Sequence, residues 1–299
     1  MNNKKQVRTI AIASTLAAAM LPLSATAGGH YTPGVEGLQA ASAPPPGLYY
    51  LAYLIDYDID RFNAPGGDHD LPGHNRGRVS AVANRLIWIT EHKVLGADFA
   101  VEALVPVART SLDLDAAGIS DTRTGIGDIY AGPALAWHGQ RWDAVATAGM
   151  WFDNASTDEP ASPGKGFKTA MFTGGLTWYF DTAKTVSASG LLRFERNGEN
   201  DDGFRPGNGL TFEWGVGKRL GAVQAGVVGY SQWQVSDDRG RGASDDRASR
   251  HAVGLQVDYA LPGTGVLLKA AAYKEIEATA GTDAAAQGSL LRLTIVKAF

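Results

Sequence analysis

The sequence contains no cysteine among its 299 residues. This absence excludes disulfide bonds and metal sites built on thiolates. Beyond residue 27, no run of 18 consecutive apolar residues occurs, so no helix is expected to span a membrane. The chain also has no excess of positive charge, because it contains 27 Lys and Arg but 31 Asp and Glu. This acidic balance argues against nucleic acid as a partner.

Residues 1–27 have the features of a secretory signal peptide. Three positive residues within the first eight precede an apolar core at 10–23, and the run at 25–27, Ala-Thr-Ala, forms a small-x-small cleavage pattern. A membrane anchor is the alternative, but the apolar run is close to the lower limit for a helix that must span with roughly 20 residues. Removing this segment takes three positive and no negative charges, which moves the formal charge from −4 to −7.

The rest of the chain is dominated by alternation with a period of two, which is typical of β-strands. In LTFEWGVGKR, for example, Phe212 and Trp214 share one face while Thr211 and Glu213 share the other. Most of these segments reach the roughly 9–11 residues that a tilted strand needs to cross a bilayer. The strands are expected near 47–60, 78–92, 97–109, 124–138, 141–152, 166–180, 183–197, 208–219, 222–236, 249–260, 265–277 and 288–299.

The connections between these strands alternate between long and short. Long polar joints such as 61–77 and 153–165 are followed by tight turns such as 94–96 and 181–184. A soluble β-sandwich, the alternative fold, has no reason to sort its loops in this way. Bacterial outer-membrane barrels have short periplasmic turns and longer extracellular loops. We therefore expect an all-β, transmembrane, antiparallel up-and-down barrel of about twelve strands, located in the Gram-negative outer membrane with both chain ends periplasmic.

The last eleven residues, SLLRLTIVKAF, alternate and end on an aromatic ring. Leu291, Leu293 and Ile295 would face lipid, and Phe299 would lie at the periplasmic interface, where such barrels carry aromatic girdles. These four residues resemble the signal by which the barrel-assembly machinery recognises its substrates. Lys297 departs from that pattern, although its stem can extend along the interface. The expected partners are this machinery, outer-membrane lipid and lipopolysaccharide.

Four stretches carry a resemblance to a known family: NRLIWIT, LGADFAVEALVPVA, GIGDIYAGPALAWHG and GLTWYF. The most specific is the third, with Gly125, Gly127, Asp128, Pro133 and Trp137. The chain resembles the outer-membrane protein family named after the meta pathway of phenol degradation, which includes a sphingosine-induced member. The resemblance covers most of the mature chain. It implies a barrel channel associated with the uptake of hydrophobic or aromatic compounds.

Inward-facing polar and aromatic side chains are the candidates for a lumen or substrate path. Charges of both signs can form either a permeation path or a salt-bridged, blocked interior, and parity alone does not choose between them. Asp128 is expected in the lumen or, alternatively, capping a turn at the rim, and Pro133 predicts a bulge or bend because it lacks a ladder donor. The candidates are Glu102, Asp128, Tyr130, Arg193, Glu195, Glu213, Arg219, Tyr230, Gln232, Lys269 and Arg292.

Residues 28–46, GGHYTPGVEGLQAASAPPP, precede the first expected strand and end in three consecutive prolines. Proline disfavours a strand here. The segment is expected either to enter the barrel from the periplasmic side as a small plug or to form a disordered tail. Residues 47–299 would then be the outer-membrane barrel.

Catalysis, cofactors and metals have little support in the sequence. His251 lies two residues from Ser249 near a strand start, but no nucleophile motif surrounds the pair. The loop SDDRGRGASDDR at 236–247 holds four aspartates beside arginines and lacks EF-hand spacing, which favours a solvated loop or one that bridges cations of lipopolysaccharide. We expect no catalytic residues, no cofactor and no metal site.

The function expected from these patterns is passive uptake of small hydrophobic or aromatic compounds across the outer membrane, without enzymatic chemistry. A structural or surface-interaction barrel with a blocked lumen is the second hypothesis. An outer-membrane hydrolase is the third.

Overall fold

The computed structural model describes residues 29–299. This part of the chain forms thirteen strands and no helix, as the alternation of its side chains predicts. The expected signal peptide, residues 1–27, lies outside this range. No helix among the described residues is long and apolar enough to cross a membrane. The strands are β1 (Gly47–Asn63), β2 (Asn75–Val94), β3 (Ala97–Leu114), β4 (Ile119–Ile126), β5 (Tyr130–His138), β6 (Trp142–Trp151), β7 (Thr169–Tyr179), β8 (Val186–Asn197), β9 (Gly209–Leu220), β10 (Val223–Gln234), β11 (Ser249–Leu261), β12 (Val266–Thr279) and β13 (Ala285–Ala298).

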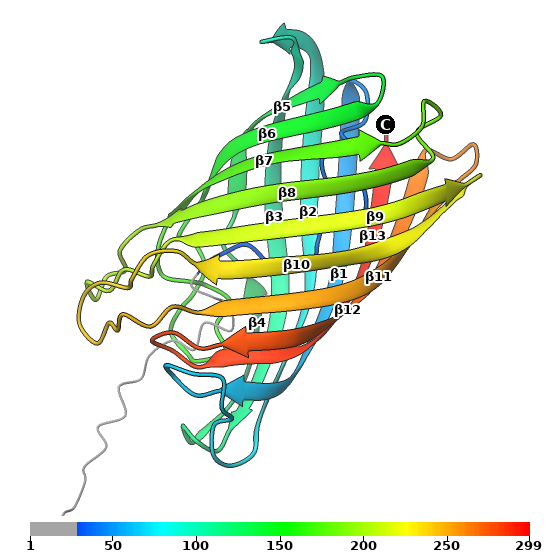
Figure 1. Cartoon of the computed structure of the whole chain (residues 1–299). Coiled ribbons are helices and arrows are strands. Elements are labelled where there is room, and N and C mark those ends of the chain that lie inside the picture. The colour runs from blue at the N-terminus through cyan, green and yellow to red at the C-terminus, as the bar shows by residue number, and fades with distance from the viewer. Residues whose placement is uncertain (1–28) are drawn as a thin grey trace, which may run out of the picture.

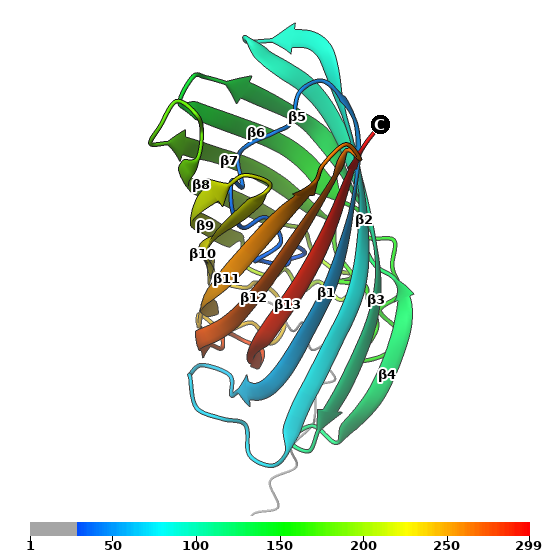
Figure 2. The same ribbon diagram turned by 90° about the vertical axis from the view of Figure 1, so that its right-hand side faces the viewer.

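The strands form one closed antiparallel barrel (Figure 1). Strands that follow one another in the sequence pair with each other, except β4 and β5, and β1 closes the sheet by pairing with both β2 and β13 (Figure 2). The first half of β3 pairs with β5 and its second half with β4, so β4 and β5 share one position in the wall. Thirteen strands therefore occupy twelve positions, which confirms the predicted twelve-stranded barrel. Closure pairs β1 on both sides, as a barrel in lipid requires. Among residues 29–299, the edge of β4 away from β3 pairs with no other strand.

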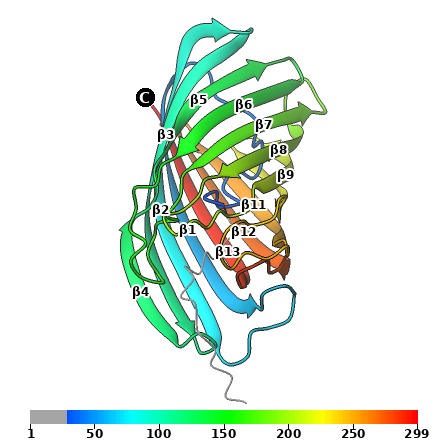
Figure 3. The same cartoon turned by 90° about the vertical axis from the view of Figure 1, so that its left-hand side faces the viewer.

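The wall is interrupted between β4 and β5, where one strand was predicted at 124–138. That prediction was wrong in detail, because residues 127–129 belong to neither strand and the loop expected before residue 124 is a β3–β4 hairpin. Gly125 and Gly127 approach Pro163 of the β6–β7 loop, and a Cβ on Gly127 would lie 3.0 Å from Pro106. β4 projects with β3 beyond the neighbouring β6 and β7 (Figure 3).

Pro133 interrupts the hydrogen-bond ladder between β5 and β6 without shifting the register of the two strands. Ala131 pairs with Met150 and Ala134 with Thr147, so no residue is inserted although Gly132 and Pro133 have no partner in β6. The expected interruption is present, but it is not a bulge. Gly132 is required here because a Cβ at this position would lie 2.2 Å from the carbonyl oxygen of Ala148.

The two faces of the barrel reverse the pattern of a soluble protein. Large apolar side chains such as Trp88, Phe172 and Leu255 are exposed on the outer face. Charged and polar side chains such as Glu213 and Gln256 are buried inside. This distribution is that of a membrane barrel whose outer surface contacts lipid and whose interior is polar.

Short turns gather at one end of the barrel and long loops at the other. The short connections are 95–96, 139–141, 180–185, 221–222 and 262–265, and the chain ends beside them, where the Phe299 amide donates to the carbonyl of Leu48 at 3.0 Å. The long connections at 64–74, 152–168, 198–208 and 235–248 lie at the opposite end. The β12–β13 connection, 280–284, is shorter than the ten-residue loop that the sequence suggested.

Candidate functional site

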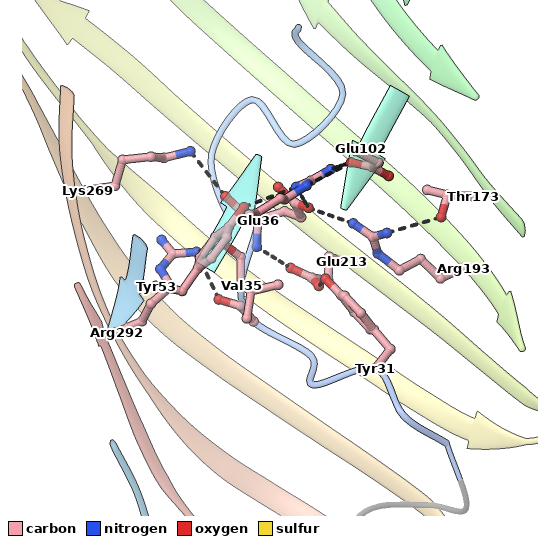
Figure 4. Close-up of polar contacts among 12 residues, drawn as sticks. Tyr31, Val35, Glu36, Tyr53, Glu102, Thr173, Arg193, Glu213, Lys269 and Arg292 are labelled. Carbon is pink, nitrogen blue, oxygen red and sulfur yellow. Dashed lines mark hydrogen bonds and ion pairs between the residues drawn. The ribbon is translucent and has the colours of Figure 1, made fainter. Parts of the chain in front are cut away.

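We call residues 29–46 the N-terminal segment. Most of it lies inside the barrel, where Tyr31, Val35 and Glu36 meet wall side chains (Figure 4), and its last three residues, Pro44 to Pro46, are exposed. The segment begins beside the long loops, where the His30 and Tyr31 amides donate to Glu195 Oε1 at 2.8 and 3.0 Å. It leaves the lumen at the opposite end, where Gly47 begins β1. The segment therefore extends along the lumen from the long-loop end to the short-turn end and does not only close one opening.

Wall side chains from several strands hold the middle of the segment. Glu213 accepts hydrogen bonds from the Tyr31 hydroxyl and from the Glu36 amide, the latter at 3.1 Å. On the other side, Arg292 Nη1 donates to the carbonyls of Gly34 and Val35, and Lys269 Nζ donates to those of Glu36 and Leu38. Because the segment has no strand or helix of its own, these side chains satisfy backbone groups that would otherwise be unpaired.

Leu38 makes one of the apolar contacts of the segment with the wall. Its side chain is fully buried against β9 and β10, where a Cβ on Gly217 or Gly226 would lie 2.9 Å from Leu38 Cδ2. Two wall glycines thus make the space that this leucine fills. Their presence on the inner face is explained by the close approach of the segment.

The start of the segment is packed around His30. Its Nδ1 lies 2.9 Å from Thr169 Oγ1 and its Nε2 lies 3.1 Å from Asp128 Oδ2. The ring stacks on Trp151, with 5.5 Å between centroids and 14° between planes, and meets Phe167 edge-on at 5.1 Å. His30 therefore ties the segment to the interrupted part of the wall.

Glu36 is the segment's only acidic side chain, and two arginines of the wall donate to it. Arg85 Nη1 and Arg193 Nη2 both donate to Glu36 Oε1, at 3.1 and 2.6 Å. Arg85 also pairs with Glu102, with 2.8 Å between Nε and Oε2. Arg193 donates to Thr173 Oγ1 at 3.1 Å, and its guanidinium lies over the Tyr31 ring at 4.2 Å.

A cavity of about 240 Å³ lies between the segment and the inner faces of β1, β2 and β3. Its walls are mainly small and apolar, with Ala81, Ala83, Leu104 and Pro106 among them. The β6–β7 loop covers it toward the long-loop end, and Glu36, Arg85 and Arg193 line it beside the segment. A concave apolar space with a few polar groups is the usual form of a small-molecule site.

The structure brings most of the predicted lumen residues together inside the barrel. Glu102, Tyr130, Arg193, Glu195, Glu213, Tyr230, Gln232 and Arg292 are buried, and Lys269 is partly buried. Tyr230 donates to Glu275 Oε1 at 2.9 Å, and Gln232 Nε2 lies 3.2 Å from Thr211 Oγ1. Of this set, Glu102, Tyr130 and Arg193 line the cavity. Their role in a substrate path stays a prediction.

Two members of the predicted set lie at the ends of the barrel. Arg219 is exposed beside a short turn, where Nη2 donates to the Ala183 carbonyl at 2.8 Å. Asp128 lies in the break between β4 and β5, where its carboxylate accepts the amides of Asn154, Ala155 and Lys165 at 3.1, 3.0 and 2.9 Å. It also lines the cavity. Asp128 thus combines the two placements that the sequence left open, at the rim and toward the lumen.

The four residues of the predicted assembly signal lie on the last strand and its end. Leu291 and Leu293 are exposed on the outer face, Ile295 is half-buried and Phe299 is exposed. Lys297 Nζ donates to the Thr264 carbonyl at 2.8 Å and lies 5.9 Å from the centre of the Phe299 ring. This lysine is therefore accommodated at the short-turn end. Recognition by assembly machinery stays a prediction.

Sequence reasoning missed several residues of the site, among them Tyr31, Glu36, Tyr53, Arg85 and Trp151. Tyr53 and Arg85 lie on the inward parity of β1 and β2, so a stricter parity count would have found them. Tyr31 and Glu36 had no such signal, because the N-terminal segment follows no strand period.

The outer wall carries a serine and histidine pair different from the one that the sequence suggested. His251 Nδ1 lies 2.8 Å from Ser231 Oγ, on the adjacent strand, rather than beside Ser249. Within residues 29–299, no third group is hydrogen-bonded to this imidazole, and no cluster of three or more His, Asp or Glu could hold a metal ion. The catalytic arrangement of an acyl hydrolase needs such an orienting group.

The closed barrel, its lipid-facing apolar surface and its polar lumen define the class: this is a transmembrane β-barrel of the outer-membrane type. A family model described as "Putative MetA-pathway of phenol degradation" matches residues 59–292. The chain belongs to this family, as its third motif suggested.

Solved structures share the fold at low sequence identity. An outer membrane channel from Pseudomonas putida F1 is 14% identical with a TM-score of 0.75, covering 90% of this chain and 100% of the other. The transport unit of the autotransporter AIDA-I from Escherichia coli is 10% identical with a TM-score of 0.52, covering 85% and 90%. No curated protein matches the chain.

Proposed function

We propose that this protein is a passive outer-membrane channel for small hydrophobic or aromatic compounds. The observation that carries the proposal is the apolar cavity inside the lumen, which lies between the β6–β7 loop and the N-terminal segment. Membership of the phenol-degradation family and the fold shared with a solved outer membrane channel support it. Selectivity would come from the lining and width of the lumen.

In this proposal the N-terminal segment is a plug that must move for solute to pass. It is held by side-chain hydrogen bonds rather than by a strand ladder, which allows movement without opening the wall. The long loops would face outward and the short turns the periplasm, where the C-terminus lies. Residues 1–27 would be the signal peptide, and barrel-assembly machinery, lipid and lipopolysaccharide would be the partners. No enzymatic step is part of the proposal.

A barrel with a blocked lumen is the second candidate, favoured by the number of wall groups that hold the segment in place. The two candidates are separated by single-channel conductance in planar bilayers, with the full chain and with residues 29–46 deleted. We expect rare, small openings with the full chain, a larger steady conductance after the deletion, and reversible block of the current by phenol. Silence of both proteins, with native heat-modifiable mobility on gels, would contradict the channel and support a barrel that displays its loops.

A further inference from the structure

The carboxylate of Glu36 is bound by two arginines of the barrel wall. It is the only carboxylate on the N-terminal segment, and both of its arginine contacts, at 3.1 and 2.6 Å, end on the same oxygen. Arginine and carboxylate form the strongest class of side-chain hydrogen bonds. The arrangement is that of an internal carboxylate ligand in an arginine site.

The two arginines differ in what they would keep if Glu36 withdrew. Arg85 would retain its ion pair with Glu102. Arg193, whose side chain is only 6% exposed, would keep its hydrogen bond to Thr173 but lose its ion pair with Glu36, and the ring of Tyr31 would leave with the segment. A buried charge left without its partner is strongly unfavourable. Another anion at Arg193 would therefore favour release of the segment.

The charges around Glu36 lead to the same conclusion. Four cations act on it: Arg85, Arg193, Lys269 and Arg292. Glu36 is the segment's carboxylate on which these four wall cations converge. If the segment withdrew, Lys269 and Arg292 would also lose its carbonyl oxygens. A carboxylate that took the place of Glu36 would face the same cations.

The cavity connects this arginine site to an apolar space. Glu36 and Arg85 are each 16% exposed, and both line the cavity together with Arg193. The remaining walls include Ile55, Val79 and Leu104, which can contact a hydrocarbon body. At about 240 Å³ the space is slightly smaller than the roughly 300–1,000 Å³ of drug-sized sites, which limits the body to about one ring.

We propose that the cavity binds small carboxylates with an apolar body, such as aromatic acids, and that the ligand's carboxylate replaces Glu36 at Arg193 and Arg85. Replacement frees the segment while keeping the arginines paired, so the solute itself opens the plug. The inference rests on the proposed function and narrows its substrate class from aromatic compounds in general to their acids.

The primary experiment uses the full-length refolded barrel at neutral pH and four probes. Single-channel open probability is measured with benzoate, with benzyl alcohol, which has a similar ring but no charge, with cyclohexanecarboxylate and with acetate. We expect benzoate and cyclohexanecarboxylate to raise it at concentrations about tenfold below those at which benzyl alcohol or acetate act, as loss of one charged contact or of the apolar body predicts.

Each result for these probes decides a different point. Equal action of benzyl alcohol and benzoate would overturn the carboxylate inference and leave the aromatic channel standing. Equal action of acetate would reduce the site to a general anion site and also overturn it. If no aromatic probe changed the current of the full chain or of the protein without residues 29–46, the proposed function itself would fail.

Two variants test the competition directly. Glu36→Gln removes the internal competitor without changing the wall, so benzoate is expected to act at concentrations about tenfold lower. Arg193→Gln removes the ligand's partner and is expected to abolish the difference between benzoate and benzyl alcohol. Arg250→Gln is the matched control, because Arg250 is also buried and paired with a carboxylate, Glu275, but does not line the cavity. If Arg250→Gln and Arg193→Gln lost the difference equally, the site would be wrong.

Discussion

Single residues in this barrel show how buried charge can hold a segment that has no secondary structure. Glu195 and Glu213 are among the most buried side chains of the barrel, and each accepts hydrogen bonds from the N-terminal segment. A carboxylate is tolerated at such positions only when partners compensate its lost hydration. The segment and the wall are therefore mutually dependent: each supplies the partners that the other lacks.

Glu195→Gln is expected to loosen the start of the segment. The substitution removes the charge that accepts two backbone amides, and hydrogen bonds to charged groups contribute about 1.5–3 kcal/mol each. Hydrogen exchange at residues 30–36 should become faster while the strands of the barrel stay protected. Glu199→Gln, four residues along in an exposed position, is the control and should leave exchange unchanged. If hydrogen exchange at residues 30–36 were the same in both variants, Glu195 would not hold the start of the segment.

Asp283, in the β12–β13 loop, makes that loop sensitive to pH. Burial, together with the nearby Asp238, raises the pKa of Asp283 to about 6. Because this exceeds the roughly 3.9 of an unfolded aspartate, the folded loop holds the proton more tightly. Its contribution to stability is fully present below about pH 4 and is lost as the pH rises through about 6.

Asp283→Asn, which stays neutral, is therefore expected to remove this pH dependence. The measurement is native-state hydrogen exchange at residues 280–284, corrected for intrinsic rates, between about pH 4.5 and 7.5. The wild-type loop should open more readily at the higher pH, and the variant should not. Protection that increases with pH in the wild type would contradict the raised pKa.

At the scale of elements, the break between β4 and β5 connects three parts of the molecule. Asp128 accepts three amides of the β6–β7 loop and also contacts His30 of the N-terminal segment. β5 ends its pairing with β6 at Tyr130 and Trp151, so the loop takes the place of a strand neighbour beside the break. The loop, the segment and the wall thus share one carboxylate.

Asp128→Ala is expected to release the loop and the start of the segment together. Amides of residues 154, 155 and 165 would lose a charged acceptor, each at a cost of about 1.5–3 kcal/mol. Hydrogen exchange should increase in 152–168 and at 30–31, with β7 to β13 unaffected. Asp113→Ala, at an exposed position of β3, is the control. Release of the loop without the segment would show that the other contacts of His30, with Glu195, Thr169 and Trp151, hold it without Asp128.

For the whole molecule, the sequence predicted the barrel well because both signals that it used are local. Alternation is readable within each strand, and loop length is readable between strands, so twelve wall positions and the sorting of loops were expected before any contact was known. The split of 124–138 was missed because a strand broken by Gly127 and Asp128 still alternates on both sides. The alternation correctly placed Arg193 and Arg219 on the inner face of the barrel. It did not indicate how far along the barrel axis each residue lies, and Arg219 lies at the end, beside a short turn.

The sequence by itself determined that this chain crosses the membrane as a closed β-barrel of its family, since period-two alternation and closure in lipid leave few other folds. Only the tertiary structure decided where the N-terminal segment lies and which groups meet there. Glu36 is separated from Arg85 and Arg193 by 49 and 157 residues, and its segment has no repeating pattern. Contacts of that kind depend on the curvature of the whole wall, which brings β2 and β8 to opposite sides of one lumen, and no local pattern encodes it.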